Sequence, residues 1–271
     1  MDRVPLPQHT GPMDTEQTDA YLRRIGAARP VAPTSDALRA LHLAHLRSVP
    51  FENLSIHLGE EIELTSRALV AKVVEARRGG FCYELNGAFA ALLTSLGFDV
   101  TLLQARVYDD GRLGIPFDHL ALRVRTRDGG DWLADVGFGA HSHLPLVLGE
   151  RGEQADPGGT FRLVERAEGD LEVVKDGKPQ YLLESRPRAL DDFTSGAWYH
   201  RTSPESHFTR SLVCSIVTGD GRVTLSGRTL TATVEGERRI TELATEAEVL
   251  AAYERHFGIR LAKEPRVREA R

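Results

Sequence analysis

The sequence is poor in cysteine, in long apolar runs and in excess positive charge. Only Cys82 and Cys214 occur in 271 residues, which is too few for a disulfide scaffold. No apolar run approaches the length needed to cross a membrane, and the first residues include no apolar segment typical of a signal peptide. The net charge of −5 provides none of the basic surface that nucleic-acid binding requires. We therefore expect a cytoplasmic protein with reduced thiols, no membrane contact and no nucleic-acid partner.

Several well-known catalytic signatures are missing as well. The sequence contains no Walker-type phosphate loop, no Gly-x-Ser-x-Gly elbow and no His-Glu-x-x-His zinc motif. His42 and His45 have a spacing that metal ligands can use, but no carboxylate or cysteine accompanies them at further helical positions. We therefore expect both histidines on a solvated helix face and predict no bound metal. Cysteine therefore remains the best candidate for a nucleophile in this sequence.

The spacing of apolar residues changes from helical to alternating along the chain. Helical spacing dominates until about residue 97, and short alternating runs between glycine-rich turns follow. These runs predict a block of antiparallel strands, which closes as a barrel or a sandwich. The last part combines strands with one helix in a small α+β unit, and residues 1–15 are typical of a flexible extension. A length of 271 residues is enough for two or three domains.

Individual elements follow from caps and periodicity. Asp14 begins the first helical pattern, Ser35 and Ser66 are the expected N-caps of two more helices, and a fourth helix extends over Cys82–Ser95. The strands that we expect in the central block are Val100–Val107, His119–Thr126, Trp132–Val136, Thr160–Val164, Leu171–Lys175 and Gln180–Leu183. After a connector with some helix, the last unit is expected to hold strands Ser211–Val217, Val223–Leu225 and Leu230–Val234 and a helix over Val249–Phe257.

Cys82 lies at the start of the fourth predicted helix. Gly79 and Gly80 break any earlier helix, and apolar residues recur at helical spacing from Leu85 onwards. The positive end of the helix dipole and the unpaired N–H groups of the first turn favour the thiolate, which is the reactive form of cysteine. A second interpretation is that Cys82 is a small core residue, as free cysteines often are. The local pattern leaves both interpretations open.

A thiol nucleophile needs a base and usually a third group that orients this base. His119 is a candidate base at the start of a predicted strand, although it could equally face solvent there. Asp135 lies in an apolar run, where a buried carboxylate requires a partner, although it could equally open the following glycine turn. A tight hairpin at Gly129-Gly130 would place Asp135 opposite Val124, about 15 Å along the strand from His119. The sequence pattern by itself therefore does not bring the two residues together.

Five motifs follow one another along the chain. They are Val49–Leu54 (VPFENL), Arg78–Asn86 (RGGFCYELN), His119–Leu122 (HLAL), Asp135–Gly139 (DVGFG) and Thr202–Phe208 (TSPESHF). In this order they resemble the arylamine N-acetyltransferase family, and the resemblance covers nearly the whole chain from about Tyr21. It implies a catalytic triad of Cys82, His119 and Asp135.

The resemblance also implies the fold class and the domain order. The expected α+β fold has an N-terminal helical bundle at 16–97, a central antiparallel β-barrel at 98–186 and a C-terminal α/β lid at 204–271. A connector at 187–203 joins the last two, and the flexible extension at 1–15 precedes the bundle. This order agrees with the changes in apolar spacing.

The activity implied by the resemblance is acetyl transfer from acetyl-CoA to arylamines, arylhydrazines or N-hydroxyarylamines, by a ping-pong mechanism through an acetyl-cysteine intermediate. Acetyl-CoA is then a co-substrate, no cofactor is bound, and a homodimer remains open. The pocket positions that it implies are Phe51, Val107, Phe138, Gly139 and Phe208, each of which could equally belong to the core. The alternative is an amide synthase of the same fold acting on a polyketide or other acyl thioester. A non-catalytic binding protein and a cysteine hydrolase are further alternatives.

Four charged residues accompany these motifs. Arg24, Glu52 and Arg78 match positions that tie the helical region of the family together, and we interpret them as structural charges. Asp118 departs from the pattern of the family, which often has a small polar residue directly before the histidine that corresponds to His119. A second carboxylate there could shift the pKa of His119 or be mistaken for the third member of the triad.

Overall fold

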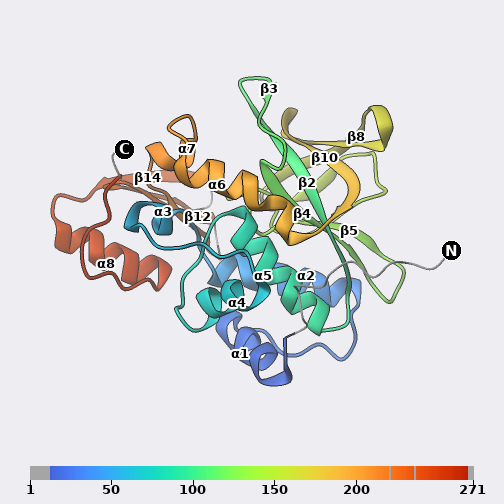
Figure 1. Ribbon diagram of the computed structural model, residues 1–271, viewed down its shortest axis with the longest axis horizontal. Helices are drawn as coiled ribbons and strands as arrows, with labels where there is room; N and C mark the ends of the chain where they lie inside the picture. Colours follow the sequence, from blue (N-terminus) through green and yellow to red (C-terminus); the bar gives the residue numbers. More distant parts are fainter. Residues whose placement is uncertain (1–12, 220, 235, 268–271) are drawn as a thin grey trace.

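The computed structural model describes residues 13–219, 221–234 and 236–267. Residues 1–12 of the expected flexible extension lie outside this part of the chain. Figure 1 shows three groups of elements: helices at the bottom, a large sheet at the upper right, and a smaller sheet with one helix at the left. Among the described residues, no helix has the length and apolar character needed to cross a membrane.

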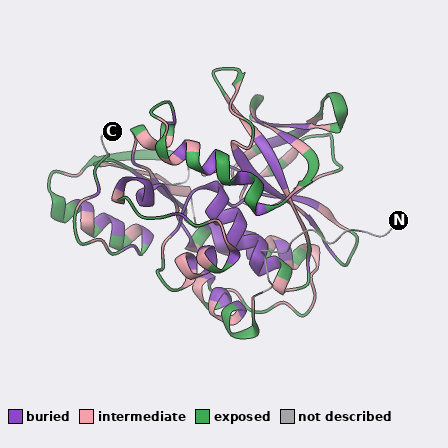
Figure 2. Ribbon diagram, in the orientation of Figure 1, coloured by how far each residue is buried: buried purple, intermediate pink, exposed green. Residues whose placement is uncertain are grey.

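Two helices of the first part begin at threonine caps. The expected N-caps Ser35 and Ser66 are each one residue too late, because Thr34 and Thr65 accept the capping hydrogen bonds from Ala37 and Ala68. The helix that begins at Cys82 is buried along nearly its whole length, as Figure 2 shows, and the other helices surround it. The bounds are α1 (Thr15–Ile25), α2 (Ser35–Ser48), α3 (Leu54–Leu58), α4 (Ser66–Val74) and α5 (Cys82–Ser95).

The large sheet is antiparallel and curls around a core of its own. Its strands are β2 (Asp99–Asp109), β3 (Arg112–Leu113), β4 (His119–Arg125), β5 (Asp131–Ala134), β6 (Leu146–Val147), β7 (Gln154–Asp156), β8 (Gly159–Glu165), β9 (Leu171–Lys175) and β10 (Lys178–Arg188). The order is β6-β5-β4-β2-β10-β9-β8-β7, β3 pairs with β2, and a short 3₁₀ turn (Ala167–Gly169) joins β8 to β9. Buried side chains from β6 at one end to β8 near the other form one apolar cluster, which is the interior of a barrel.

The two faces of β4 have different neighbours. Leu120, Leu122 and Val124 belong to the same apolar cluster as α5, whereas Ala121 points into the barrel core. The alternation predicted for this strand is therefore confirmed. All six strands expected in the central block are present, and only β3, β6 and β7, with two or three residues each, were not predicted.

The smaller sheet combines one short strand from the first part of the chain with four strands from the last part. Its order is β1-β11-β12-β13-β14, with β1 (Phe51–Glu52), β11 (Cys214–Val217), β12 (Gly221–Ser226), β13 (Thr229–Val234) and β14 (Glu237–Glu242). Apolar side chains of α8 (Glu246–Phe257) pack on this sheet. β14 was not predicted, because all its residues are exposed and Ile240 is its only large apolar residue.

A helical segment connects the two sheets. Some helix was expected in the connector at 187–203, where the structure has a short 3₁₀ helix, η2 (Leu190–Phe193). The longer α6 (Thr194–Thr202) follows it directly, and α7 (His207–Arg210) comes next. In Figure 1, α6 and α7 lie above α5, between the barrel and the smaller sheet.

Candidate functional site

His119 and Asp135 form a buried pair. Their Nε2 and Oδ2 atoms are 2.7 Å apart, and each residue is 2% exposed. His119 is the first residue of β4, and Asp135 follows the last residue of β5. The structure thus excludes a solvent-facing His119 and gives Asp135 the partner that a buried carboxylate needs.

The register of the β4–β5 hairpin explains how the two residues meet. Leu122 pairs with Ala134 and Val124 pairs with Trp132, so the same register brings Asp135 to Ala121. The tight hairpin that placed Asp135 opposite Val124 was therefore wrong. The loop is longer than a two-residue turn, because the last hydrogen bond between the strands is donated by the N–H of Thr126 to the carbonyl of Gly130. Asp128, within the loop, accepts hydrogen bonds from Ser35 on α2.

Three further donors hold the Asp135 carboxylate. Asn86 Nδ2 donates to Oδ1 at 2.9 Å, the Gly137 N–H donates to Oδ1 at 3.0 Å, and the Tyr181 hydroxyl donates to Oδ2 at 3.2 Å. Burial alone would raise the pKa of Asp135, but the charge and hydrogen bond of His119, the charge of His141 and the hydrogen bond from Asn86 hold it well below its usual range. Asn86 was not predicted as a site residue. The only sequence signal for it is its position in the cysteine motif, one helical turn after Cys82. Nothing in the sequence pattern distinguishes Tyr181 from other strand residues.

The pKa of His119 is raised despite its burial. Burial favours the neutral imidazole, but the charge and hydrogen bond of Asp135, together with the neighbouring Cys82 side chain, outweigh it and raise the pKa to about 10. These contacts therefore favour the imidazolium form of His119. A positive charge beside a thiol favours the thiolate, so the pair supplies the environment of a reactive cysteine.

Cys82 is both buried and close to His119. It is the first residue of α5, is 4% exposed and belongs to the apolar cluster, so the two interpretations of this residue are compatible. A Cβ at Gly137 would lie 2.8 Å from the Cα of Cys82, so only glycine lets the loop after β5 approach the helix start. Cys214 is also buried, but burial raises the pKa of its thiol well above the usual value.

Cys82 and His119 line a cavity of about 710 Å³. Four of the five expected pocket residues, Phe51, Val107, Phe138 and Phe208, line the same cavity. The fifth, Gly139, lies against the Phe51 ring, since a Cβ there would be 3.7 Å from this ring. Its φ of +90° favours glycine, so its role is in the path of the loop.

The prediction that His42 and His45 lie on a solvated helix face was wrong. Both are fully buried and contact the Phe89 ring, and burial lowers their pKa values to about 4 and about 3. His42 Nε2 accepts the backbone N–H of Asp135 at 3.2 Å, and its Nδ1 donates to the carbonyl of His143 at 3.0 Å. His42 thus connects α2 to the loop that holds Asp135. Over residues 13–219, 221–234 and 236–267, no group of three or more side chains is arranged to hold a metal ion.

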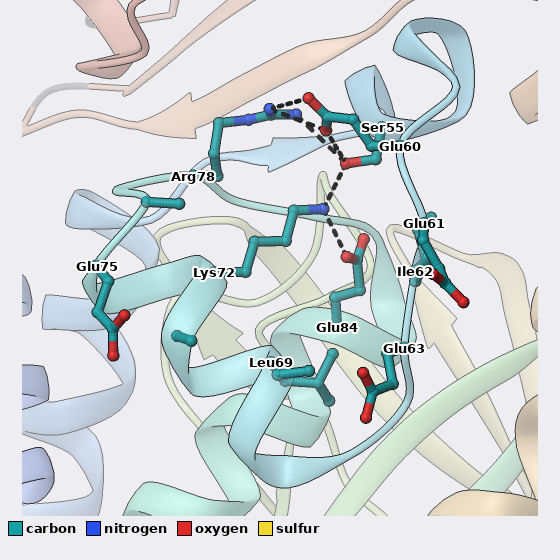
Figure 3. Close-up of a pocket in the computed structure, with 13 residues that line it drawn as sticks. Ser55, Glu60, Glu61, Ile62, Glu63, Leu69, Lys72, Glu75, Arg78 and Glu84 are labelled. Carbon is teal, nitrogen blue, oxygen red and sulfur yellow. Dashed lines mark hydrogen bonds and ion pairs between the residues drawn. The ribbon is translucent and has the colours of Figure 1, made fainter.

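A second cavity, of about 440 Å³, lies beside the start of α5 (Figure 3). Lys72 donates to Glu84 at 2.5 Å and to the hydroxyl of Ser55 at 2.8 Å, and Arg78 pairs with Glu60 at 3.1 Å. Figure 3 shows these charged groups pointing toward one another. The charges of Lys72, Glu84, Arg78 and Glu60 in this lining therefore already have partners.

This charged network fixes the beginning of α5. Glu84 accepts the backbone N–H of Phe81 at 3.2 Å, and Arg78 pairs with the fully buried Glu52 at 2.9 Å. Elsewhere in the helical part, Arg24 donates to backbone carbonyls of α2 and α4. These contacts agree with the interpretation of Arg24, Glu52 and Arg78 as structural charges.

Comparison with known proteins places the chain in one family. A family described as N-acetyltransferase matches residues 34–266. The arylamine N-acetyltransferase of Mycolicibacterium smegmatis is 37% identical over 251 residues, which cover 89% of this chain and 91% of that protein. A protein of Salmonella typhimurium named arylamine N-acetyltransferase / N-hydroxyarylamine O-acetyltransferase is 36% identical, over 76% of this chain and 75% of its own length.

Solved structures of arylamine N-acetyltransferases are similar to this chain over most of its length. The M. smegmatis enzyme has a TM-score of 0.84 at 37% identity and covers 92% of this chain and 93% of its own. The Mycobacterium marinum enzyme in complex with CoA has a TM-score of 0.82 at 32% identity and covers 89% and 92%. Because the fold, the order of the motifs and most of the length agree, this chain belongs to the arylamine N-acetyltransferase family.

Proposed function

We propose that the protein transfers an acetyl group from acetyl-CoA to arylamines, arylhydrazines or N-hydroxyarylamines through an acetyl-cysteine intermediate on Cys82. The observation that carries the proposal is the buried His119–Asp135 pair beside Cys82, in a cavity with aromatic walls. The names of the relatives support arylamines as acceptors, and the CoA complex of the M. marinum enzyme supports a CoA thioester as donor. An amide synthase is not favoured, because the relatives found are named for acetyl transfer.

In the first half-reaction, the Cys82 thiolate attacks the carbonyl carbon of the acetyl-CoA thioester. The bond between this carbon and the CoA sulfur breaks, and the departing CoA thiolate takes the proton of the His119 imidazolium. Asp135 holds the imidazole in the tautomer and orientation that this transfer requires. We assign stabilisation of the oxyanion to backbone N–H groups in the first turn of α5, which have no partner within the helix.

In the second half-reaction, the amine nitrogen attacks the acetyl-cysteine. His119, now neutral, takes the proton that the nitrogen loses, and the Cys82 thiolate departs. The resting imidazolium and thiolate are thereby restored. The same site serves both half-reactions, so the kinetics are ping-pong. Phe51 and Phe208, whose ring centroids are 6.1 Å apart, provide apolar surface for a flat aromatic acceptor.

Acetylation of the intact protein tests this proposal. With acetyl-CoA and no amine, we expect mass spectrometry to detect one added acetyl group, and peptide mapping to assign it to Cys82. The two cysteines provide a matched comparison: Cys82→Ala should carry no adduct, whereas Cys214→Ala should be acetylated like the wild type. Full transfer to an amine by Cys82→Ala would refute the proposed intermediate.

The raised pKa of His119 predicts an unusual pH dependence. Since the pKa of His119 is raised to about 10, its positive charge beside the Cys82 sulfur should persist over the neutral and mildly alkaline range. We expect the alkylation rate of Cys82 by iodoacetamide to change less than threefold between about pH 7 and about pH 9, whereas that of an ordinary thiol rises about 20-fold. Stopped-flow measurement with Cys214→Ala isolates the Cys82 signal. An increase like that of a free thiol would contradict the ion pair.

A further inference from the structure

We infer that Asp118, His200 and Ser206 set the distance between the two walls of the Cys82 cavity, and so determine which amines it accepts. The inference rests on the proposed function, because it concerns the choice of acceptor at the same site. All three residues line the cavity, and they come from both of its walls.

The walls come from distant parts of the chain. One wall extends from the end of β2 through β3 to the start of β4 and includes Val107 and Asp118. The other is formed by the end of α6 and by α7, and it includes His200 and Phe208. Cys82 and His119 line the cavity between the two walls.

A continuous chain of hydrogen bonds crosses from one wall to the other. Asp118 Oδ2 accepts the N–H of Val107 at 3.0 Å. His200 Nε2 lies 2.9 Å from Asp118 Oδ1 and 3.2 Å from the backbone carbonyl oxygen of the same residue. On the far side of the ring, His200 Nδ1 and Ser206 Oγ are 3.1 Å apart, and the same oxygen accepts the N–H of Phe208 at 3.2 Å. The two ends of the chain are therefore the backbones of Val107 and Phe208, the expected pocket residues on opposite walls.

The partners of His200 assign its tautomer. A carboxylate only accepts, so Nε2 carries a proton and donates to Asp118. In the neutral ring Nδ1 then accepts from the Ser206 hydroxyl, and every polar atom of the chain has a suitable partner. Because His200 and Ser206 are buried, these hydrogen bonds are shielded from water and act together as one connection.

The backbone before His119 is shaped to direct Asp118 at His200. Phe117 has a φ of +59°, an uncommon conformation for a residue with a side chain, and the Tyr83 hydroxyl donates to the carbonyls of Phe117 and Asp118. A Cβ at Gly196 on α6 would lie 2.3 Å from the Phe117 carbonyl oxygen, so the two walls touch here. Asp118 is thus directed at α6, while His119 contacts Asp135.

Asp118 therefore has a role other than the one considered from the sequence. The charges that raise the His119 pKa belong to Asp135 and Cys82, while both Asp118 oxygens are held by the two walls. At the other end of the connection, the Phe208 ring contacts Phe51 and Phe81, so a shift of α7 changes the space above Cys82. Breaking the connection lets the walls move apart, which favours larger acceptors.

Acceptor selectivity tests the inference. We expect Asp118→Ser and His200→Phe each to raise the ratio of kcat/KM for two-ring 2-naphthylamine over one-ring aniline about tenfold, with most of the change in KM. His200→Phe removes the contacts of the ring with both the carboxylate and the backbone carbonyl of Asp118, so the double variant should match His200→Phe. Ser206→Ala removes one oxygen only and provides the same test if a larger change prevents folding. His256→Phe, on α8 and away from the cavity, is the control.

The outcomes separate the inference from the proposed function. An unchanged amine ratio in these variants, or equal losses for both amines together with a lower Tm, would show that the three residues are merely structural. Additive effects in the double variant would also overturn the inference. If the proposed function itself is wrong, the wild type transfers acetyl to neither amine and Cys82 remains unmodified.

Discussion

Asp135→Asn is expected to lower kcat for acetyl transfer by about 10⁴-fold, the loss seen when asparagine replaces the orienting aspartate of a Ser-His-Asp triad. The substitution removes the charge that raises the His119 pKa, so the imidazolium and the neighbouring thiolate become less populated at neutral pH. It also presents an amide N–H₂ group to a site where Asn86, Gly137 and Tyr181 all donate. Initial rates of CoA release at several acetyl-CoA concentrations measure the loss.

Asp131→Asn is the matched control for this substitution. Asp131 is the first residue of β5, the strand that Asp135 follows, and it is partly exposed and pairs with Arg123. We expect its activity to stay within about twofold of the wild type, as for most surface substitutions. The alkylation profile of Asp135→Asn should also regain the steep pH dependence of an ordinary thiol. A well-folded Asp135→Asn protein with near wild-type activity would exclude Asp135 as the orienting group.

Arg78→Ala is expected to lower the free energy of unfolding by about 3–5 kcal/mol. The substitution leaves the Glu52 carboxylate, which is fully buried, without the guanidinium 2.9 Å away. Burial alone would raise the pKa of Glu52, and the charges of Lys72 and Arg78 outweigh burial and lower it. Because the folded-state pKa is depressed, this stabilisation is present above the unfolded pKa and is lost as the pH falls. Urea unfolding at neutral pH and at about pH 4 measures both effects.

Two variants show whether the loss comes from the unpaired carboxylate. Replacing both partners, as in Glu52→Leu with Arg78→Met, should restore most of the stability lost in Arg78→Ala, because no unpaired carboxylate then remains buried at position 52. Arg29→Ala breaks the exposed pair with Asp19 and should lower stability by about 0–1 kcal/mol. If Arg78→Ala lost as little stability as Arg29→Ala, water or another group would have to solvate the Glu52 carboxylate.

The sequence was a good guide to elements whose neighbours are local. The period of the apolar residues predicted α5 and the alternation of β4, because each reflects one buried face. It also placed Cys82 at the first turn of its helix. The caps were displaced by one residue, since threonine and serine are adjacent at both helix starts and both can cap.

The features that the sequence did not predict depend on tertiary contacts. The β4–β5 loop closes at the hydrogen bond between Thr126 and Gly130, and Asp128 within it bonds to Ser35 far away in the chain. His42 was assigned to solvent because polar residues on helices usually face it, whereas here the aspartate loop covers the ring. The meeting of His119 with Asp135 needed the observed register, so before that the family resemblance was the only reason to expect it.

The pairing of β1 with β11 has a consequence for the order of folding. Phe51 pairs with Ser215 and Glu52 with Cys214, so one edge of the smaller sheet is formed by residues from the other half of the chain. Contacts between such distant residues close large loops and form slowly. A fragment that begins at residue 204 would expose the edge of β11 and is expected to aggregate. Because Phe51 also lines the cavity, the substrate site is expected to be completed only after the C-terminal half has been synthesised.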